Sequence, residues 1–235
     1  MIDLHTHTTH SDGKQTVSQL LKKAEQQNLK IISITDHQSV GAYTELRDPK
    51  IRALFSGKII TGVELNFQHN GLQNEILGYG IDPEKLNANT EINMMTKEKF
   101  DEALAMYHKV TAGITDKAER LLTWQAYISN QKIDSLHAVS KAIRDAGGKA
   151  FMAHIFRTIK HDDAVALLDY CVEHKLIDGI EVYYRDHDIP FSKEQVEFLE
   201  KYCKKHGLLA SGGSDNHRPE RPLATDIPQK AVAWL

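Results

Sequence analysis

The chain has 235 residues, with 29 Lys and Arg against 32 Asp and Glu, so its formal net charge is −3 when histidine is neutral. Hydrophobic residues make up 41% and charged residues 26%, a globular mixture that excludes collagen-like, disulfide-scaffold and wholly disordered classes. The near-neutral net charge does not indicate a general basic surface that would bind a long nucleic acid. Two cysteines, no apolar run of membrane-spanning length and no secretory leader predict a soluble cytoplasmic protein without a membrane partner.

Short apolar runs alternate with amphipathic segments along the chain. Strands are predicted over residues 2–7, 30–35, 58–64, 75–80, 149–153, 179–184 and 208–212. Helices are predicted over 16–28, 40–55, 161–174 and 192–206, the second of them broken near Pro49, with capping boxes at Thr16 and Ser192. Residues 90–146 read as a mostly helical insertion or lid within a single domain, 1–235. This order favours an α/β fold with a mostly parallel sheet, either a barrel or a doubly wound sheet.

The chain carries 13 histidines, and many of them collect with acidic residues where the predicted strands end. In parallel α/β folds the C-terminal ends of the strands form the active-site face. A chain without a site there would scatter such residues over its surface helices. The coincidence of residue type and position therefore predicts a metal site built from His5, His7, Asp12, His37, Glu64, His154, Asp215 and His217.

The chemistry of these residues fits metal binding. His5 and His7 are two residues apart, so on a strand both imidazoles face one side, although two half-buried histidines bonded to backbone would give the same pattern. Glu64 closes an apolar strand, where a buried charge is costly unless it is paired. Imidazoles with carboxylates suit Zn²⁺, Mn²⁺ or Fe²⁺ better than Ca²⁺. Eight or nine such groups exceed the needs of one ion and predict two or three divalent ions bridged by a carboxylate.

At these positions the sequence resembles the PHP (polymerase and histidinol phosphatase) family of metal-dependent phosphoesterases. The resemblance extends from residue 3 to residue 217 and keeps the family's order of motifs. It implies a distorted (β/α)₇ TIM-like barrel of the PHP type with up to three metal ions at its C-terminal face. The matching segments are residues 3–8, 11–13, 34–37, 62–64, 153–154 and 213–217.

The same resemblance implies how the ligands are shared. One ion would take His5, His7, Glu64 and Asp215, and a third would take Asp12, His37 and His217. Glu64 would bridge to a second ion, which also takes His154. Where the family usually places another histidine for this second ion, the chain has Glu75. A carboxylate still ligates but changes the local charge and the preferred metal, and the alternative is a surface glutamate at a strand start.

Three further residues are predicted to contact substrate. Arg157 follows His154, although the chain has Ile155 where many relatives have proline, and a guanidinium matches phosphate oxygens well. A surface arginine paired with a nearby acid is the alternative for Arg157. Arg185, which follows another predicted strand, is a weaker candidate, and a solvated loop histidine explains His10 equally well. Asp36 is predicted to orient a neighbouring histidine.

The resemblance predicts a metal-dependent phosphoesterase in which a metal-bridging hydroxide attacks phosphorus. Its predicted catalytic residues are Asp12, His37, Glu64 and His217. A small phosphorylated metabolite or nucleotide is the favoured substrate, and a 5′-3′ exonuclease acting on short RNA is the alternative. A non-catalytic metal-binding module and an amidohydrolase are weaker hypotheses, and no obligate protein partner is evident. Tyr107, Trp124 and Tyr127 could stack on a base but are predicted to pack in a hydrophobic core instead.

Overall fold

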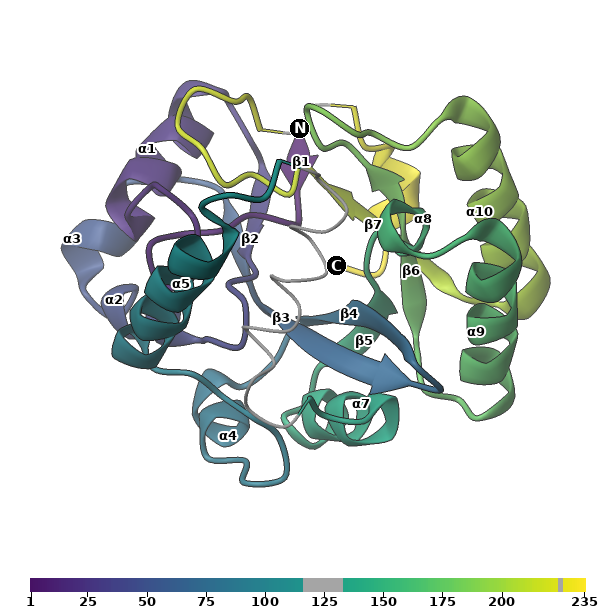
Figure 1. Ribbon diagram of the computed structural model, residues 1–235. Coiled ribbons are helices and arrows are strands. Elements are labelled where there is room, and N and C mark those ends of the chain that lie inside the picture. The colour runs from purple at the N-terminus through teal and green to yellow at the C-terminus, as the bar shows by residue number, and fades with distance from the viewer. Residues whose placement is uncertain (116–132, 224–225) are drawn as a thin grey trace.

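The computed structural model describes residues 1–115, 133–223 and 226–235. Within them seven strands form one sheet in sequence order, and the helices lie outside the ring of strands (Figure 1). The strands are β1 (Ile2–Asp3), β2 (Ile31–Ile34), β3 (Lys58–His69), β4 (Leu72–Tyr79), β5 (Lys149–Met152), β6 (Gly179–Tyr184) and β7 (Leu209–Gly213).

The sheet curls into a nearly closed barrel, with β7 returning beside β1. The Leu4 backbone N–H donates to the Gly212 carbonyl at 3.1 Å, and Thr6 forms a parallel bridge with Asn216. Glycine is needed at this seam, because a Cβ on Gly213 would lie 2.4 Å from the His5 backbone nitrogen. The predicted α/β barrel is therefore confirmed, and the doubly wound alternative is wrong.

The central hairpin departs from the predicted alternation. β1–β3 and β5–β7 pair in parallel, whereas β4 runs antiparallel to both of its neighbours. The prediction that Glu64 ends its strand is wrong, because β3 continues to His69 and turns at Asn70 and Gly71. Both turn residues have positive φ, 48° and 80°, as an Asn-Gly hairpin turn requires. The hairpin pairs Asn66, two residues after Glu64, with Glu75 on β4, and so adds a second carboxylate at this end of the barrel.

The helices begin where local capping signals place them. The capping boxes of α1 at Thr16 and of α10 at Ser192 are both present. The predicted helix over 40–55 is two shorter helices, since Asp48 caps a new helix that starts at Pro49. The helices are α1 (Val17–Gln26), α2 (Gly41–Glu45), α3 (Pro49–Arg52), α4 (Pro83–Asn87), α5 (Lys97–Thr111), α7 (Leu136–Asp145), α8 (Ile155–Thr158), α9 (His161–Glu173) and α10 (Lys193–His206), with a 3₁₀ turn η1 (Gln229–Val232).

The two described helices of the predicted insertion pack differently. α7 buries Leu136, Val139 and Ile143 in the main core of the barrel. α5 instead contributes Phe100 to a small separate cluster with Met95. Residues 116–132, with Trp124 and Tyr127, lie outside the described part of the chain, so the lid role of residues 90–146 stays a prediction.

Two further features bear on the predictions from composition. Cys171 and Cys203 are both free and buried, and burial raises the pKa of each thiol to about 12. None of the described helices combines the length and apolar character that a membrane crossing requires.

Candidate metal centre

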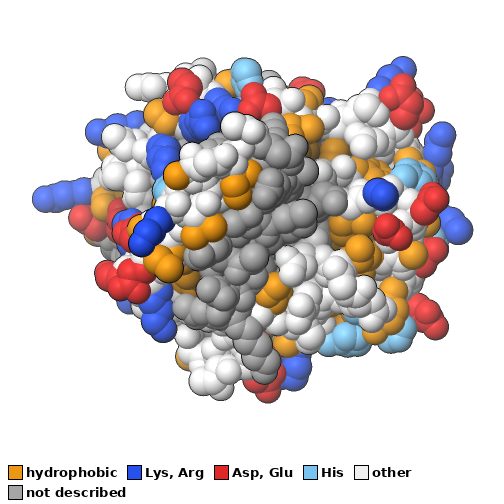
Figure 2. All heavy atoms as spheres, viewed as in Figure 1, with side chains coloured by type: hydrophobic (Ala, Val, Ile, Leu, Met, Phe, Trp, Pro, Cys, Tyr) orange, Lys and Arg blue, Asp and Glu red, His pale blue; other side chains and the backbone are white. Residues whose placement is uncertain are grey.

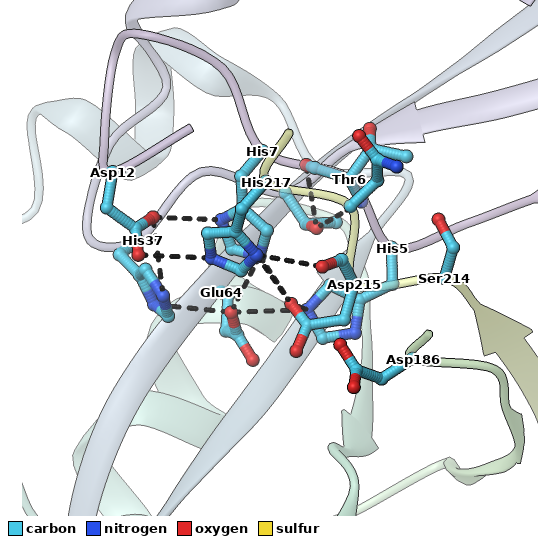
Figure 3. Close-up of polar contacts among 12 residues, drawn as sticks. His5, Thr6, His7, Asp12, His37, Glu64, Asp186, Ser214, Asp215 and His217 are labelled. Carbon is cyan, nitrogen blue, oxygen red and sulfur yellow. Dashed lines mark hydrogen bonds and ion pairs between the residues drawn. The ribbon is translucent and has the colours of Figure 1, made fainter. Parts of the chain in front are cut away.

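Four side chains converge at the end of the barrel from segments far apart in the chain (Figure 3). His5 and His7 follow β1, Glu64 lies inside β3, and Asp215 follows β7. Glu64 Oε2 lies 3.2 Å from His5 Nε2 and 3.3 Å from His7 Nε2. Asp215 Oδ1 lies 3.4 Å and 3.1 Å from the same two nitrogens. The structure thus brings together the first predicted ligand group.

Three atoms that face one another in this group have the environment expected of metal ligands. His5 Nε2, His7 Nε2 and Glu64 Oε2 are buried and make no hydrogen bond to any residue that the structure describes. Burying such polar atoms without partners is costly, and a cation at their common focus relieves the cost. The donor set of two imidazoles and two carboxylates therefore fits a divalent metal ion.

A second group shares His7 and lies nearer the surface. One ligand atom from each of His7, Asp12, His37 and His217 lies within 4.8 Å of the others. His217 Nδ1 donates to the Asp215 carbonyl at 2.8 Å, so the lone pair of its Nε2 faces Asp12 Oδ2 at 3.1 Å. This tautomer leaves the Nε2 lone pair of His217 available to a cation.

The third group adds Glu75 to the bridging carboxylate. His154 Nε2 lies 3.0 Å from Glu64 Oε1 and 3.3 Å from Glu75 Oε2. On the other side, His37 Nδ1 lies 3.2 Å from Glu64 Oε2 and 3.8 Å from Glu75 Oε1. Glu64 therefore touches all three sets of donors, and Glu75 is a buried participant rather than a surface residue.

Burial and charge pairing shift the pKa values of several groups in the centre. Burial opposes charge on His7, but the Asp215 and Glu64 carboxylates beside it outweigh burial and raise its pKa to about 10. Burial likewise disfavours the Glu64 carboxylate, yet the His5 imidazole holds its pKa well below the usual range. For Glu75 both burial and the neighbouring Glu64 charge raise the pKa. A bound cation would replace the protons that the imidazoles now share with the carboxylates.

Glu181 is a buried residue of the centre that sequence reasoning missed. Its Oε1 accepts from His5 Nδ1 at 2.9 Å, and its Oε2 accepts from the His154 backbone N–H at 2.9 Å. The first contact leaves His5 Nε2 free of a proton for ligation, since a carboxylate only accepts. A signal like the one used for Glu64 could have found it, because an acid within an apolar strand is costly to bury unless it is paired.

Asp36 supports the centre, though by a different route from the predicted one. It accepts from the Ser11 hydroxyl at 2.6 Å and from the Thr8 backbone and hydroxyl, both at 2.7 Å. Ser11 Oγ in turn lies 3.4 Å from His7 Nδ1. Asp36 therefore fixes the loop after β1 and reaches the histidine through Ser11.

The predicted substrate residues differ in position. Arg157 Nη1 donates to Asp215 Oδ2 at 2.9 Å, beside the Tyr184 hydroxyl, which donates to the same oxygen at 2.9 Å. Arg185 instead pairs with the exposed Asp226 through its Nε at 3.0 Å. His10 Nε2 lies 2.7 Å from Glu45 Oε1 and lines a separate hollow of about 600 Å³. Only Arg157 among these residues contacts a candidate metal ligand.

Comparison with known proteins decides the family. The profile of the PHP domain family matches residues 3–175. The chain belongs to the PHP domain family. The match includes most of the candidate ligands described above, whereas Asp215 and His217 lie beyond it. The chain is a metal-dependent phosphoesterase, a hydrolase of phosphoester bonds.

PHP relatives of known activity span three kinds of phosphoester hydrolysis. The 5′-3′ exoribonuclease Rnm of Escherichia coli is 26% identical, over 92% of this chain and 85% of its own. The 3′,5′-nucleoside bisphosphate phosphatase of Chromobacterium violaceum is 22% identical, over 93% and 87%. The phosphoribosyl 1,2-cyclic phosphate 1,2-diphosphodiesterase of Eggerthella lenta is 25% identical, over 92% and 93%.

Solved structures share the PHP barrel. A chain from Bifidobacterium adolescentis, whose name includes metal-dependent phosphoesterase, superposes with a TM-score of 0.66 at 20% identity, over 98% of this chain and 93% of its own. A structure from Chromobacterium violaceum called an amidohydrolase, with bound sulfate, gives a TM-score of 0.67 at 23% identity, over 97% and 92%. At these identities the likeness concerns the fold.

Proposed function

We propose that this PHP chain is a phosphatase acting on a small, nucleotide-sized phosphorylated substrate. The observation that carries the proposal is the position of Glu64, whose two oxygens contact donors from all three ligand groups. A carboxylate at such a junction suits a cluster of ions that grips one phosphoryl group from several sides.

The residues of the chain fit two or three divalent ions, which we propose to be Zn²⁺, Mn²⁺ or Fe²⁺. When bound, such ions supply Lewis acidity toward phosphoryl oxygens and lower the pKa of coordinated water. The proposed catalytic residues Asp12, His37, Glu64 and His217 hold this chemistry in place. Glu181 fixes the tautomer of His5 for the same purpose.

Arg157 is proposed to bind the phosphoryl group. Its guanidinium is fixed at Asp215, a ligand candidate, and is only partly exposed, with 27% of the side chain accessible. A guanidinium carries five N–H donors in a planar fork, so it can bind a phosphoryl oxygen beside the ions without leaving Asp215. The positive charge would also offset charge that develops on the phosphoryl oxygens.

The hollow that His10 lines suits the body of a small substrate. Its volume of about 600 Å³ lies within the range of small-molecule sites, roughly 300–1,000 Å³. His10 and Ser39 form part of its wall, and each is two residues from a ligand candidate, Asp12 or His37. Thr44 lines it from α2 and Lys97 from α5, so the lining is both polar and charged. We assign His10 to substrate contact on this basis, whereas Arg185 is not among the residues that line the hollow.

A long single-stranded nucleic acid would need a continuous basic groove. The arginines near the centre are instead paired with acids: Arg157 with Asp215, and Arg221 with Asp186. Figure 2 shows Lys and Arg side chains intermixed with Asp and Glu on the face it presents. Short RNA remains the second candidate substrate, because the Escherichia coli relative is a 5′-3′ exoribonuclease.

The rates at which the chain hydrolyses different substrates distinguish a phosphatase from an exonuclease. The Mn²⁺-loaded chain is given nucleoside 3′,5′-bisphosphates, nucleoside monophosphates or short 5′-phosphorylated RNA, and the release of phosphate and of mononucleotides is measured. We expect phosphate from a mononucleotide at a higher kcat/KM than mononucleotides from RNA. Thr44→Trp, which fills the hollow, should raise KM for the nucleotide and leave hydrolysis of a small aryl phosphate unchanged. Faster cleavage of RNA would contradict the phosphatase and favour the exonuclease.

A further inference from the structure

We infer that the group containing Glu64, Glu75 and His154 is an oxygen-rich position that selects a hard divalent cation, Mn²⁺ or Mg²⁺. The group containing Asp12, His37 and His217 is imidazole-rich and selects Zn²⁺ or Fe²⁺, so the centre binds two different metals. This inference rests on the proposed metal centre and adds metal selectivity to it.

The donor sets differ in the way that selectivity requires. The group of His7, Asp12, His37 and His217 offers three imidazoles and one carboxylate. The group around Glu75 offers two carboxylates, with His154 on one side and His37 on the other. Whether His154 or His37 is the imidazole ligand, the group around Glu75 has a larger share of oxygen donors than the group containing Asp12, and twice its carboxylate charge.

Glu75 is held where it can act as a ligand. It lies on β4 opposite Asn66, inside the antiparallel hairpin, and only 7% of the residue is exposed. Its Oε2 faces His154 Nε2 at 3.3 Å and its Oε1 faces His37 Nδ1 at 3.8 Å. Both oxygens therefore point into the centre, which allows binding through one oxygen or through both.

The two neighbouring carboxylates need a counter-charge. Glu64 and Glu75 share His154 as a contact, at 3.0 Å and 3.3 Å, and lie together in the barrel interior. Like charges in such a place repel one another unless a proton or a cation lies between them. A dication balances two carboxylates, and hard oxygen donors favour Mn²⁺ and Mg²⁺, whereas imidazoles favour Zn²⁺ and Fe²⁺.

Metal counting under competition tests this inference without any substrate. The full chain is equilibrated in buffers that fix free Zn²⁺ and Mn²⁺, and bound metals are counted by mass spectrometry, with the electron paramagnetic resonance signal of bound Mn²⁺ as a second readout. Because Zn²⁺ binds most sites more tightly than Mn²⁺, the free Mn²⁺ is set in excess and the ratio of affinities is compared. The variants are Glu75→His, Glu75→Asp and, as a matched control on exposed α5, Glu102→His.

The wild-type chain should hold both metals at once, with Mn²⁺ retained at one position while Zn²⁺ fills another. Glu75→His should shift one position toward Zn²⁺ by a factor on the order of ten and remove its Mn²⁺ signal. Glu75→Asp should keep Mn²⁺, and Glu102→His should match the wild type. Zinc at every position of the wild type, or an unchanged ratio in Glu75→His, would overturn the inference. Failure of the proposed phosphatase would appear separately, as no phosphate release from a chain whose metal content is as expected.

Discussion

At the scale of single residues, the centre depends on groups that orient its ligands. Glu181 accepts one hydrogen bond from His5 and one from the backbone of His154, so a single carboxylate sets the geometry of ligands from two groups. Both partners donate, so both oxygens of the Glu181 side chain act as acceptors.

Glu181→Gln should therefore weaken metal binding without unfolding the chain. The amide oxygen can accept from the His154 backbone, but the NH₂ group then faces His5 Nδ1 and forces its proton onto Nε2, the ligating atom. We expect affinity at the His5 position to fall by about 10- to 100-fold in a chelator-competition titration. Glu200→Gln, which alters a carboxylate that accepts from Tyr183 at 2.5 Å, is the control and should bind metal normally. Wild-type affinity in Glu181→Gln would contradict this role.

At the scale of elements, the β3–β4 hairpin delivers both Glu64 and Glu75. Its turn at Asn70 and Gly71 needs positive φ at both residues, which asparagine and glycine tolerate and other residues adopt at a cost. The turn lies several residue pairs from the carboxylates, so its strain should affect the stability of the hairpin more than the geometry of the centre.

Gly71→Ala should destabilise the fold and spare metal binding. The φ of 80° at Gly71 penalises a Cβ by about 1 kcal/mol even though no atom lies within 4 Å of it. Urea unfolding would measure the loss, and the metal content should not change. Gly113→Ala is the matched control, since that glycine also has open space but no positive φ. Equal stabilities of the two variants would show that the turn is not strained.

The helices were predictable because their signals are local. The capping boxes at Thr16 and Ser192 and the apolar periodicity of α1 appear in the sequence and again in the structure. The strand β4 was predicted but its antiparallel direction was not, because the direction of a strand depends on its connection to the preceding strand. Because the prediction ended β3 at Glu64, the Asn70-Gly71 turn was not recognised as the turn of a hairpin.

The ligand positions were predictable for a related reason, and their supports were not. His5, His37 and Asp215 each follow a strand at one end of the barrel, where metal-ligating and catalytic residues are expected. Glu181 and Tyr184 lie inside or at the end of an apolar run, and their roles come from contacts with His5 and Asp215 that lie 176 and 31 residues away in sequence. Only the folded barrel reveals such pairs.

At the scale of the whole molecule, the barrel carries a charge network that responds to pH. The folded-state pKa of His7, about 10, exceeds the usual 6.5, so its stabilising contribution is complete below pH 6.5 and is lost as pH rises through 10. Asp215 has the opposite sign. Burial raises its pKa, but His5 and neighbouring cations lower it further, so its contribution is present above its usual value of 3.8 and is lost at lower pH.

Metal should stabilise the chain more at higher pH, because it competes with the protons on His7 and its neighbours. At 100 times the Kd, binding adds about 2.7 kcal/mol, which corresponds to a Tm increase of roughly 5–10 °C for a chain of this size. Thermal unfolding with and without Mn²⁺ at about pH 6 and about pH 8 measures the difference. A larger Tm increase at the lower pH would mean that His7 and its neighbours do not exchange protons for metal.

The most direct test of the whole account is phosphate release from a nucleoside monophosphate or bisphosphate by the metal-loaded wild type and by Glu64→Gln. Glu64 joins the three ligand groups, so its replacement should lower kcat/KM by about 10²- to 10³-fold and reduce the bound metal while the barrel stays folded. A folded Glu64→Gln chain with wild-type activity would show that phosphoester hydrolysis does not take place at this centre.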